Sequence, residues 1–221
     1  MKTSSNMKPI DPTTYGKNYF EHGKAHGLSC YENYRWLPDL TLPMVKALIK
    51  NLGIKKTDTI LDFGCAKGYV VKAFRSLGYN CKGCDISEYA ISCADDETRE
   101  HLCLLGADGQ LPASGGQAWD WILAKDVLEH LTHEQIAHVV ADFYAHALNV
   151  FAAVPLGDGS RFIIPEMEQD VTHVTRESLE WWRGQFFRHG FEHVRDHHEM
   201  RGIKENWTKP YPLGNGFLVA S

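Results

Sequence analysis

From residue 59 onward, short apolar runs alternate with segments of helical spacing, and this alternation limits the fold more than any other feature of the sequence. The apolar runs predict strands at residues 59–63, 80–85, 101–107, 119–128 and 148–154. Helical patterns follow the first, second and fourth runs, beginning near residue 67, at Ser87 and at Thr132. Repeated strand–helix units of this kind predict a parallel sheet with helices on both faces.

The segments on either side extend this α/β domain and do not indicate a second domain. Leucine and valine recur at helical spacing over residues 39–52, and a further helix is predicted over 176–188. Two more apolar runs, at 193–198 and 215–221, bring the predicted strands to seven. We expect residues 1–52 to form an N-terminal extension on the lid and substrate side, including the first helix, and residues 53–221 to form one globular unit.

Composition narrows the class of protein. The 221 residues, 43% of them hydrophobic, suit one α/β domain with a single core, and a net charge of −5 offers no basic field to nucleic acid. The six cysteines lie mostly in apolar stretches, as reduced thiols do. No signal-peptide core is present, and no run reaches the about 20 apolar residues that span a bilayer. We therefore expect a cytoplasmic protein with no membrane or nucleic-acid partner; the sequence leaves the oligomeric state open.

The turn after the first predicted strand, ILDFGCAKGY at residues 60–69, is where a ligand is expected. In an open α/β sheet, ligands bind beyond the carboxyl ends of the strands. The dinucleotide fingerprint requires glycine five residues after Gly64, where Tyr69 stands, and the phosphate-loop pattern fails at the same residue. Both phosphate-binding interpretations are excluded.

The features of this turn that remain to be interpreted are Asp62, Gly64 and Gly68. Glycines allow the backbone to approach a ligand closely, helix amides accept a carboxylate, and an acid suits an ammonium group. This combination fits an amino-acid zwitterion. Asp85, 23 residues after Asp62, ends the second strand, where an acid binds both hydroxyls of a ribose. Asp108 follows the third strand, where an adenine amino group can be met.

Four segments together resemble the class I S-adenosylmethionine-dependent methyltransferases, over about residues 60–191. They are LDFGCAKGY, GCDISEYAI, GADGQLP and DWILAKDVLEHL. The resemblance implies a Rossmann-like seven-stranded sheet of order 3-2-1-4-5-7-6 with the last strand antiparallel. It also implies S-adenosylmethionine as cofactor and S-adenosylhomocysteine as product. Ala66 departs from the commonest pattern, which has glycine there.

The resemblance also implies roles for individual residues. The methionine portion of the cofactor would face Gly64, Cys65, Ala66 and Gly68, with Asp62 beside it. The ribose would meet Asp85 and Ile86, the adenine Asp108 and Gly109, and the sulfonium Ala124 and Lys125. In the N-terminal YGKNYF segment, Tyr15 and Tyr19 are candidates for a lid over the cofactor.

Two constellations are candidates for catalysis. Glu129 and His130 follow the fourth strand at the ligand-facing edge, and Asp170 and His173 precede the helix at 176–188. A histidine in such a loop suits general-base work, because its ordinary pKa is near 6.5. We rank His173 as the first candidate base and His130 as the second. Structural support is the alternative role for each pair.

We expect no metal site, because no HExxH spacing occurs and Cys81 and Cys84, three apart on one strand, point to opposite faces. The predicted activity is methyl transfer to a hydroxyl or amine of a small molecule, such as a sugar or a specialised metabolite. The alternatives are a protein or tRNA methyltransferase and a catalytically silent binding module with the same fold. A third, an enzyme that binds a nicotinamide dinucleotide, would need a pyrophosphate turn, against which the glycine spacing argues.

Overall fold

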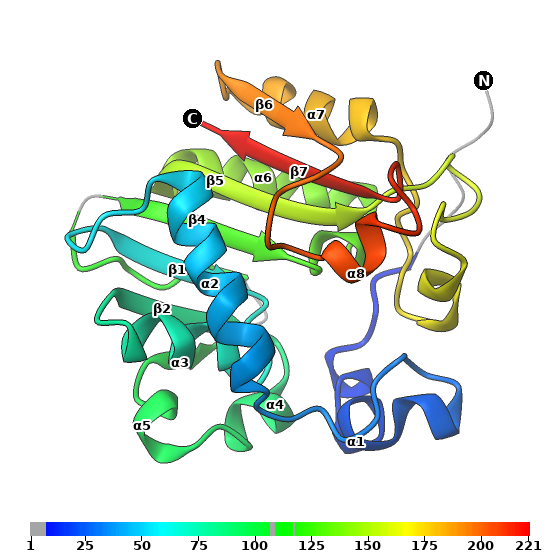
Figure 1. Ribbon diagram of the computed structural model, residues 1–221, viewed down its shortest axis with the longest axis horizontal. Helices are drawn as coiled ribbons and strands as arrows, with labels where there is room; N and C mark the ends of the chain where they lie inside the picture. Colours follow the sequence, from blue (N-terminus) through cyan, green and yellow to red (C-terminus); the bar gives the residue numbers. More distant parts are fainter. Residues whose placement is uncertain (1–7, 107–108, 117) are drawn as a thin grey trace.

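One seven-stranded mixed sheet organises the computed structural model, which describes residues 8–106, 109–116 and 118–221. Its order, β3-β2-β1-β4-β5-β7-β6, confirms the expected one (Figure 1). The strands are β1 Thr59–Phe63, β2 Asn80–Asp85, β3 Leu102–Leu104, β4 Trp119–Lys125, β5 Ala147–Pro155, β6 Val194–His197 and β7 Asn215–Ala220. Strands β1 to β5 pair in parallel, and β7 is antiparallel to both β5 and β6.

Helices cover both faces of the sheet. They are α1 Lys17–His26, α2 Pro38–Leu52, α3 Tyr69–Ser76, α4 Glu88–Ser92, α5 Asp96–Arg99, α6 His133–His146, α7 Leu179–Arg188 and α8 Glu205–Thr208. Three short 3₁₀ helices, η1 Pro12–Thr14, η2 Leu128–His130 and η3 Pro165–Gln169, lie in the connections. None of the helices in these ranges has the length and apolar character needed to span a membrane.

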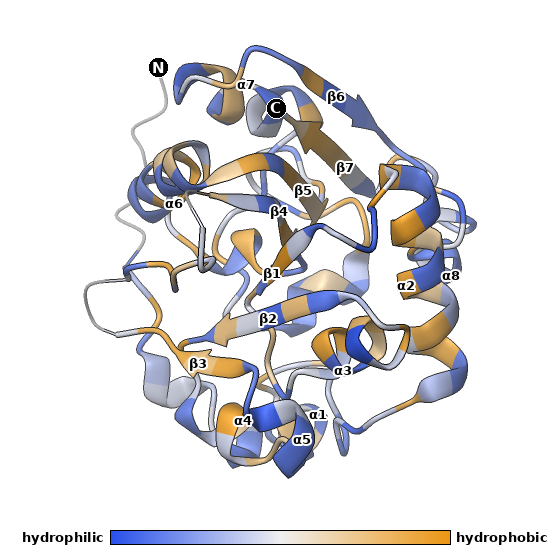
Figure 2. Ribbon diagram, turned by 90° about the vertical axis from the view of Figure 1, so that its left-hand side faces the viewer, coloured by the Kyte–Doolittle hydropathy of each residue, from blue (hydrophilic) through white to orange (hydrophobic). Residues whose placement is uncertain are grey.

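Each face of the sheet has its own hydrophobic core. On one face α6 and α7 bury Phe143, Trp182 and Phe186, and on the other α2 and α3 bury Leu48 and Phe74. Figure 2 shows the central strands β4, β5 and β7 as largely apolar, whereas the edge strand β6 is largely hydrophilic. Strands covered on both faces are expected to be apolar throughout, because neither face meets water.

Local signals in the sequence explain most element boundaries. Ser87 caps α4 by accepting a hydrogen bond from the backbone amide of Ala90. Thr132 caps α6 in a capping box with Gln135, as its predicted helix start requires. Cys81 and Cys84 are fully buried in opposite cores, which confirms that they cannot share a ligand.

The structure differs from the predictions in four segments, one of which is the strand predicted over 119–128, which ends at Lys125. In the described part of the strand predicted over 101–107, residues 101–106, strand β3 spans Leu102–Leu104, and the helix predicted from residue 176 begins at Leu179 because Ser178 is its N-cap. Residues 1–36 showed no period, yet α1 forms there. Its apolar stripe is broken at His22, which has non-helical backbone angles, so periodicity could not reveal it.

Candidate active site

A cavity of about 110 Å³ lies at the carboxyl ends of β1, β2, β3 and β4. Strand order reverses between β1 and β4, which is where an open α/β sheet binds its ligand. Seven of the residues predicted for the site line it: Tyr15, Tyr19, Gly64, Ala66, Asp85, Ile86 and His130. Its lining also includes residues that the sequence did not single out: Phe20, Tyr31, Phe63, Leu105, Asp126, Val127 and Leu131.

The turn after β1 forms the floor of the cavity. The amides of Gly64 and Cys65 both donate to the carbonyl of Cys84, at 2.9 and 3.0 Å, so the chain leaves β1 bound to the end of β2. Gly64 has φ +75°, and a Cβ there would lie 2.4 Å from Cγ2 of Val127. The glycine is required twice, by its backbone angle and by the close approach of the segment after β4.

Asp85 fixes the shape of this floor. Its Oδ2 accepts a hydrogen bond of 2.7 Å from the amide of Ala66, and its Oδ1 accepts one of 2.7 Å from the amide of Ser87. Burial raises the pKa of this carboxyl group. Each carboxylate oxygen can accept about two hydrogen bonds, so both retain capacity for the hydroxyls of a ribose.

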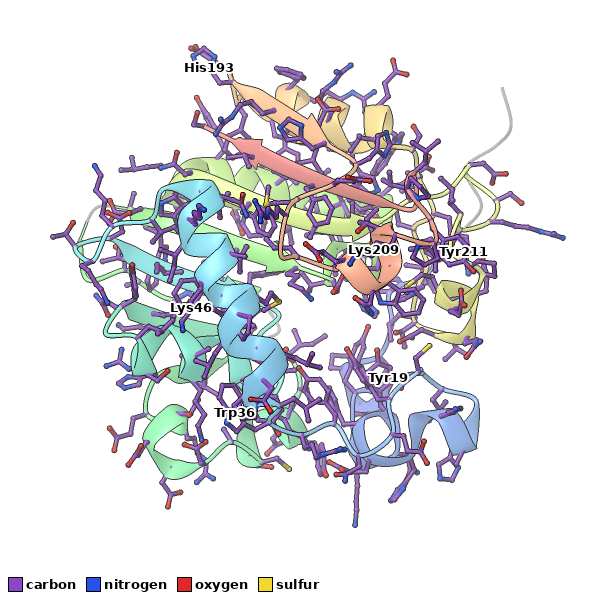
Figure 3. The ribbon with its side chains drawn as sticks, viewed as in Figure 1. Tyr19, Trp36, Lys46, His193, Lys209 and Tyr211 are labelled. Carbon is purple, nitrogen blue, oxygen red and sulfur yellow. The ribbon has the colours of Figure 1, made fainter. Side chains whose placement is uncertain are left out.

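The roof of the cavity is aromatic and comes from residues 8–36. Tyr19 and Phe20 of α1 are buried against Tyr31, and Tyr15 lies against Tyr19 with ring centroids 5.1 Å apart. Figure 3 shows Tyr19 on the side of α1 that faces the sheet. Lys67 connects the floor to the roof, because its ammonium group pairs with Glu21 and donates to the carbonyl of Tyr34 at 2.8 Å.

Other predicted cofactor residues lie outside the lining of the cavity. Asp62 is buried within β1, and burial raises its pKa to about 7. Cys65 is packed in the core beside β2, and a Cβ at Gly68 would meet Leu102 and Thr98 rather than the cavity. Three more are Ala124, buried inside β4; Lys125, paired with Asp126; and Gly109, where a Cβ would meet nothing within 4 Å. Asp108 lies outside the described residues.

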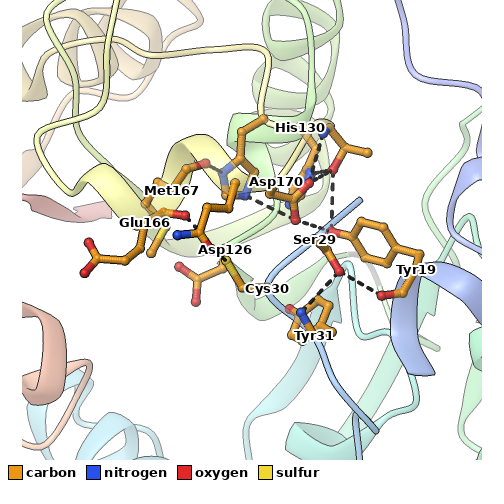
Figure 4. A network of polar contacts seen from close by, with 12 residues as sticks. Tyr19, Ser29, Cys30, Tyr31, Asp126, His130, Glu166, Met167 and Asp170 are labelled. Carbon is orange, nitrogen blue, oxygen red and sulfur yellow. Dashed lines mark hydrogen bonds and ion pairs between the residues drawn. The ribbon is translucent and has the colours of Figure 1, made fainter. Parts of the chain in front are cut away.

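The four predicted catalytic residues come together beside the cavity, which His130 lines. Figure 4 shows two of them, His130 and Asp170, in one network of polar contacts. Tyr19 donates its hydroxyl hydrogen to Oδ2 of Asp170 at 2.7 Å, and Thr172 donates its own to Oδ1 of the same carboxylate at 2.5 Å. Nδ1 of His130 lies 2.7 Å from the Thr172 hydroxyl oxygen. The rings of His130 and His173 are 4.7 Å apart between centroids. Thr172, at the centre of this network, is not among the catalytic residues predicted from the sequence.

Backbone hydrogen bonds connect the segment that carries Glu129 and His130 to the loop that carries Asp170 and His173. The amides of Val174 and Thr175 donate to the carbonyl of Glu129 at 2.9 and 3.0 Å, and the Thr175 hydroxyl donates to the carbonyl of Leu131 at 2.6 Å. The loop after β5 is thus paired with η2 after β4. This pairing places His173 beside His130, although more than forty residues separate them in the chain.

Burial sets the charge of the titratable groups. It lowers the pKa of His130 to about 4, with the neighbouring His173 adding to the effect, and it lowers the pKa of His173 as well. Burial and the nearby Asp126 raise the pKa of Glu129 to about 8. Both imidazoles are therefore neutral near pH 7, and each can accept a hydrogen bond from a ligand.

Asp126 is a lining residue that the sequence did not reveal. It has φ +55°, and its carboxylate pairs with both Lys125 and Lys204. The two ammonium groups keep its pKa well below the ordinary value in spite of burial. Lys204 comes from the segment before α8, more than seventy residues away, so no local pattern could have indicated this pair.

Comparison with known proteins gives one family and many structures of similar fold. The family model described as "Methyltransferase domain" matches residues 37–206. No curated protein matches the sequence. The structure is similar to that of a SAM-dependent methyltransferase from Archaeoglobus fulgidus, at 16% identity and a TM-score of 0.61, over 83% of this chain and 96% of that one.

Two further structures show the same fold. A putative O-methyltransferase from Nostoc punctiforme is 14% identical with a TM-score of 0.62, over 100% of this chain and 63% of that one. A phosphoethanolamine N-methyltransferase from Haemonchus contortus, solved with S-adenosylhomocysteine, is 14% identical with a TM-score of 0.59, over 80% of this chain and 51% of that one.

Proposed function

The chain belongs to the class I S-adenosylmethionine-dependent methyltransferases, and from that premise we propose that it transfers the methyl group to a hydroxyl or amine of a small molecule. One observation supports the small acceptor most directly. The cavity lies under an aromatic roof and is lined by the neutral imidazole of His130, and the ring of His173 lies behind it, with the two ring centroids 4.7 Å apart. Such a site encloses a compact molecule, whereas a polymer requires an open groove.

The residues present suit the cofactor chemically. Asp85 would accept hydrogen bonds from the ribose, the turn from Gly64 to Gly68 would face the methionine portion, and apolar Ile86 and Leu105 would flank the adenine. The roof would have to shift to admit it, because 110 Å³ is below the roughly 300–1,000 Å³ of ordinary ligand pockets. We therefore assign residues 1–52 to a lid and substrate-side extension and residues 53–221 to the cofactor-binding domain.

S-adenosylmethionine supplies a methyl group that its positive sulfur already activates. The protein then has to align the acceptor with the methyl group and to exclude water. Tyr15 and Tyr19 cover the cavity, while His130 and His173 would accept hydrogen bonds from the acceptor and so orient its attacking lone pair. The acceptor proton becomes strongly acidic as the new bond forms, and a neutral imidazole is then able to take it.

The experiment begins with calorimetric titration of S-adenosylmethionine, S-adenosylhomocysteine and, as a control, NAD into the full chain. Micromolar binding of the two sulfur compounds alone is expected. Transfer of labelled methyl is then compared among a library of hydroxylated and amine-bearing small molecules, bulk tRNA and a protein extract. Label in the small-molecule fraction supports the proposal; label in tRNA or protein overturns the acceptor class. Cofactor binding without transfer to any fraction favours the silent binding module.

A further inference from the structure

In place of the expectation from sequence spacing that no metal site exists, we propose that Glu129, His130 and His173 form a binding site for one divalent transition-metal ion at the acceptor end of the cavity. One ligand atom from each residue lies within 4.8 Å of the other two. Because His130 also lines the cavity, an ion held here would meet the acceptor. The inference rests on the proposed function and deepens it: coordination of the acceptor to the ion takes the place of direct hydrogen bonds from the acceptor to the two imidazoles.

The hydrogen bonds of His173 leave a ring nitrogen free for a metal. Nδ1 of His173 lies 2.8 Å from the carbonyl of Met167, which only accepts, so the ring hydrogen sits on Nδ1. Nε2 then keeps its lone pair. Nε2 is 3.9 Å from Oδ2 of Asp170, beyond hydrogen-bond distance, and that oxygen already accepts from Tyr19.

His130 is fixed in the same tautomer by a longer chain of hydrogen bonds. The Thr172 hydroxyl has one hydrogen, which it donates to Oδ1 of Asp170 at 2.5 Å. Its oxygen must therefore accept from Nδ1 of His130, 2.7 Å away, and Nε2 of His130 again keeps its lone pair. Metal-binding histidines generally donate the other ring hydrogen to a supporting group, as both imidazoles do here.

Glu129 supplies an independent reason to expect a cation. The residue is 1% exposed, and its Oε2 has no hydrogen-bond partner within residues 8–106, 109–116 and 118–221. A buried polar atom without a partner is costly, at about 1–3 kcal/mol, and requires an explanation. A metal ion between this oxygen and the two Nε2 atoms provides one.

The surrounding charges are compatible with a positive ion. Three carboxylates, those of Asp126, Glu129 and Asp170, lie near two ammonium groups, those of Lys125 and Lys204. Both lysines pair with Asp126, so neither is engaged with Glu129. Once Glu129 gives up its proton to bind an ion, the formal sum is −1, which favours binding of a cation.

Two imidazole nitrogens and one carboxylate oxygen suit Zn²⁺, Co²⁺ or Mn²⁺ better than Mg²⁺ or Ca²⁺, which prefer oxygen ligands. Such a set leaves coordination positions for the acceptor oxygen. On transfer, the acceptor hydroxyl releases its proton to solvent and its oxygen lone pair forms the bond to the methyl carbon. The carbon–sulfur bond breaks with its electron pair remaining on sulfur, which gives S-adenosylhomocysteine.

The test is calorimetric titration of Co²⁺, Zn²⁺, Mn²⁺ and Mg²⁺ into the chelator-treated full chain, with the visible absorption of bound Co²⁺ as a second readout. One Co²⁺ or Zn²⁺ per chain at micromolar or lower concentration is expected, with much weaker Mg²⁺ binding. Glu129→Gln and His173→Ala should weaken Co²⁺ binding more than about 100-fold. Thr172→Val, which removes the support of His130 together with one hydrogen bond to Asp170, should weaken it about 10–100-fold.

Matched controls lie on the exposed side of α6, five and eight residues from the proposed ligands. Glu134→Gln and His138→Ala should leave the Co²⁺ titration unchanged. The proposal is overturned if the folded wild-type chain binds none of the transition ions, or if Glu129→Gln and His173→Ala bind Co²⁺ as the wild type does. Cofactor titration of the same chelator-treated protein separates the two claims: intact S-adenosylmethionine binding without metal binding removes the metal site and leaves the proposed function in place.

Discussion

The floor and the roof of the cavity are built in different ways. The floor, residues 60–69 with the end of β2, depends on backbone geometry: positive φ angles at Gly64 and Ala66 and amides bound to Asp85. The roof, residues 8–36, depends on packing between aromatic side chains and a few polar contacts to the body. A backbone-built floor is expected to be rigid and intolerant of substitution, whereas a roof of packed side chains can open at low cost.

The strongest test of the floor is Gly64→Ala. The added Cβ combines the cost of a positive φ with a contact of 2.4 Å to Val127, so we expect a loss of roughly 3–5 kcal/mol in the free energy of unfolding. Cofactor affinity should also fall more than about 100-fold at temperatures where the variant remains folded. Urea unfolding and calorimetry measure the two effects.

Gly53→Ala is the matched control. Gly53 has φ +71° at the end of α2, and a Cβ there meets nothing within 4 Å. Gly53→Ala should lower the free energy of unfolding by only about 1–2 kcal/mol, because it strains the backbone angle alone. Equal losses for the two variants would show that the approach of Val127 does not constrain the floor.

Asp62 should make the floor sensitive to pH. Its carboxyl titrates near 7 when folded and near 3.8 in the unfolded chain, so the unfolded form loses its proton first and stability falls as pH rises from 4 to 7. Asp62→Asn removes this penalty. We expect the variant to match the wild type at pH 4 and to exceed it by roughly 2–4 kcal/mol at pH 8, at about 1.4 kcal/mol per pKa unit. A difference that does not change with pH would contradict the buried, protonated carboxyl.

The same contrast explains what could be predicted from the sequence. The floor was predictable, because glycines, a terminal acid and strand–helix alternation are local signals; the sheet order followed from the resemblance that they establish. The roof was predictable only as two candidate tyrosines, since α1 has no continuous apolar period. The grouping of His130 with Thr172 depends on backbone pairing between two distant loops, which no spacing in the sequence encodes.

Asp85→Asn tests whether the floor recognises the ribose. An amide can accept through only one of its two terminal atoms, so the variant loses charge-assisted hydrogen bonds, and we expect cofactor affinity to fall by about 2–3 kcal/mol, or roughly 30–150-fold. Calorimetry with S-adenosylhomocysteine measures this. Asp95→Asn is the control, because Asp95 also accepts from backbone and side chain as a helix cap but lies outside the cavity lining. Equal affinities in the two variants would place the ribose elsewhere.

The smallest expected effect concerns the connection between floor and roof. Lys67 is 6% exposed and binds Glu21 and the carbonyl of Tyr34, so Lys67→Met leaves the roof attached by fewer polar contacts. If the roof opens to release the cofactor, dissociation should become about 5–10-fold faster, equivalent to roughly 1 kcal/mol, with little change in association. Stopped-flow displacement of a fluorescent cofactor analogue measures both rates.

Two variants complete this test. Lys72→Met removes an ion pair with Asp95 that is far more exposed and a weak cation–π contact with Trp36, 5.5 Å from the ring centroid, so it should change dissociation by less than about 2-fold. Glu21→Gln should act in the same direction as Lys67→Met, and the double variant should be no faster than the Lys67 variant alone, because both changes remove the same pair. Additive effects would instead mean that Lys67 and Glu21 act independently, and that the polar link between floor and roof is the carbonyl of Tyr34.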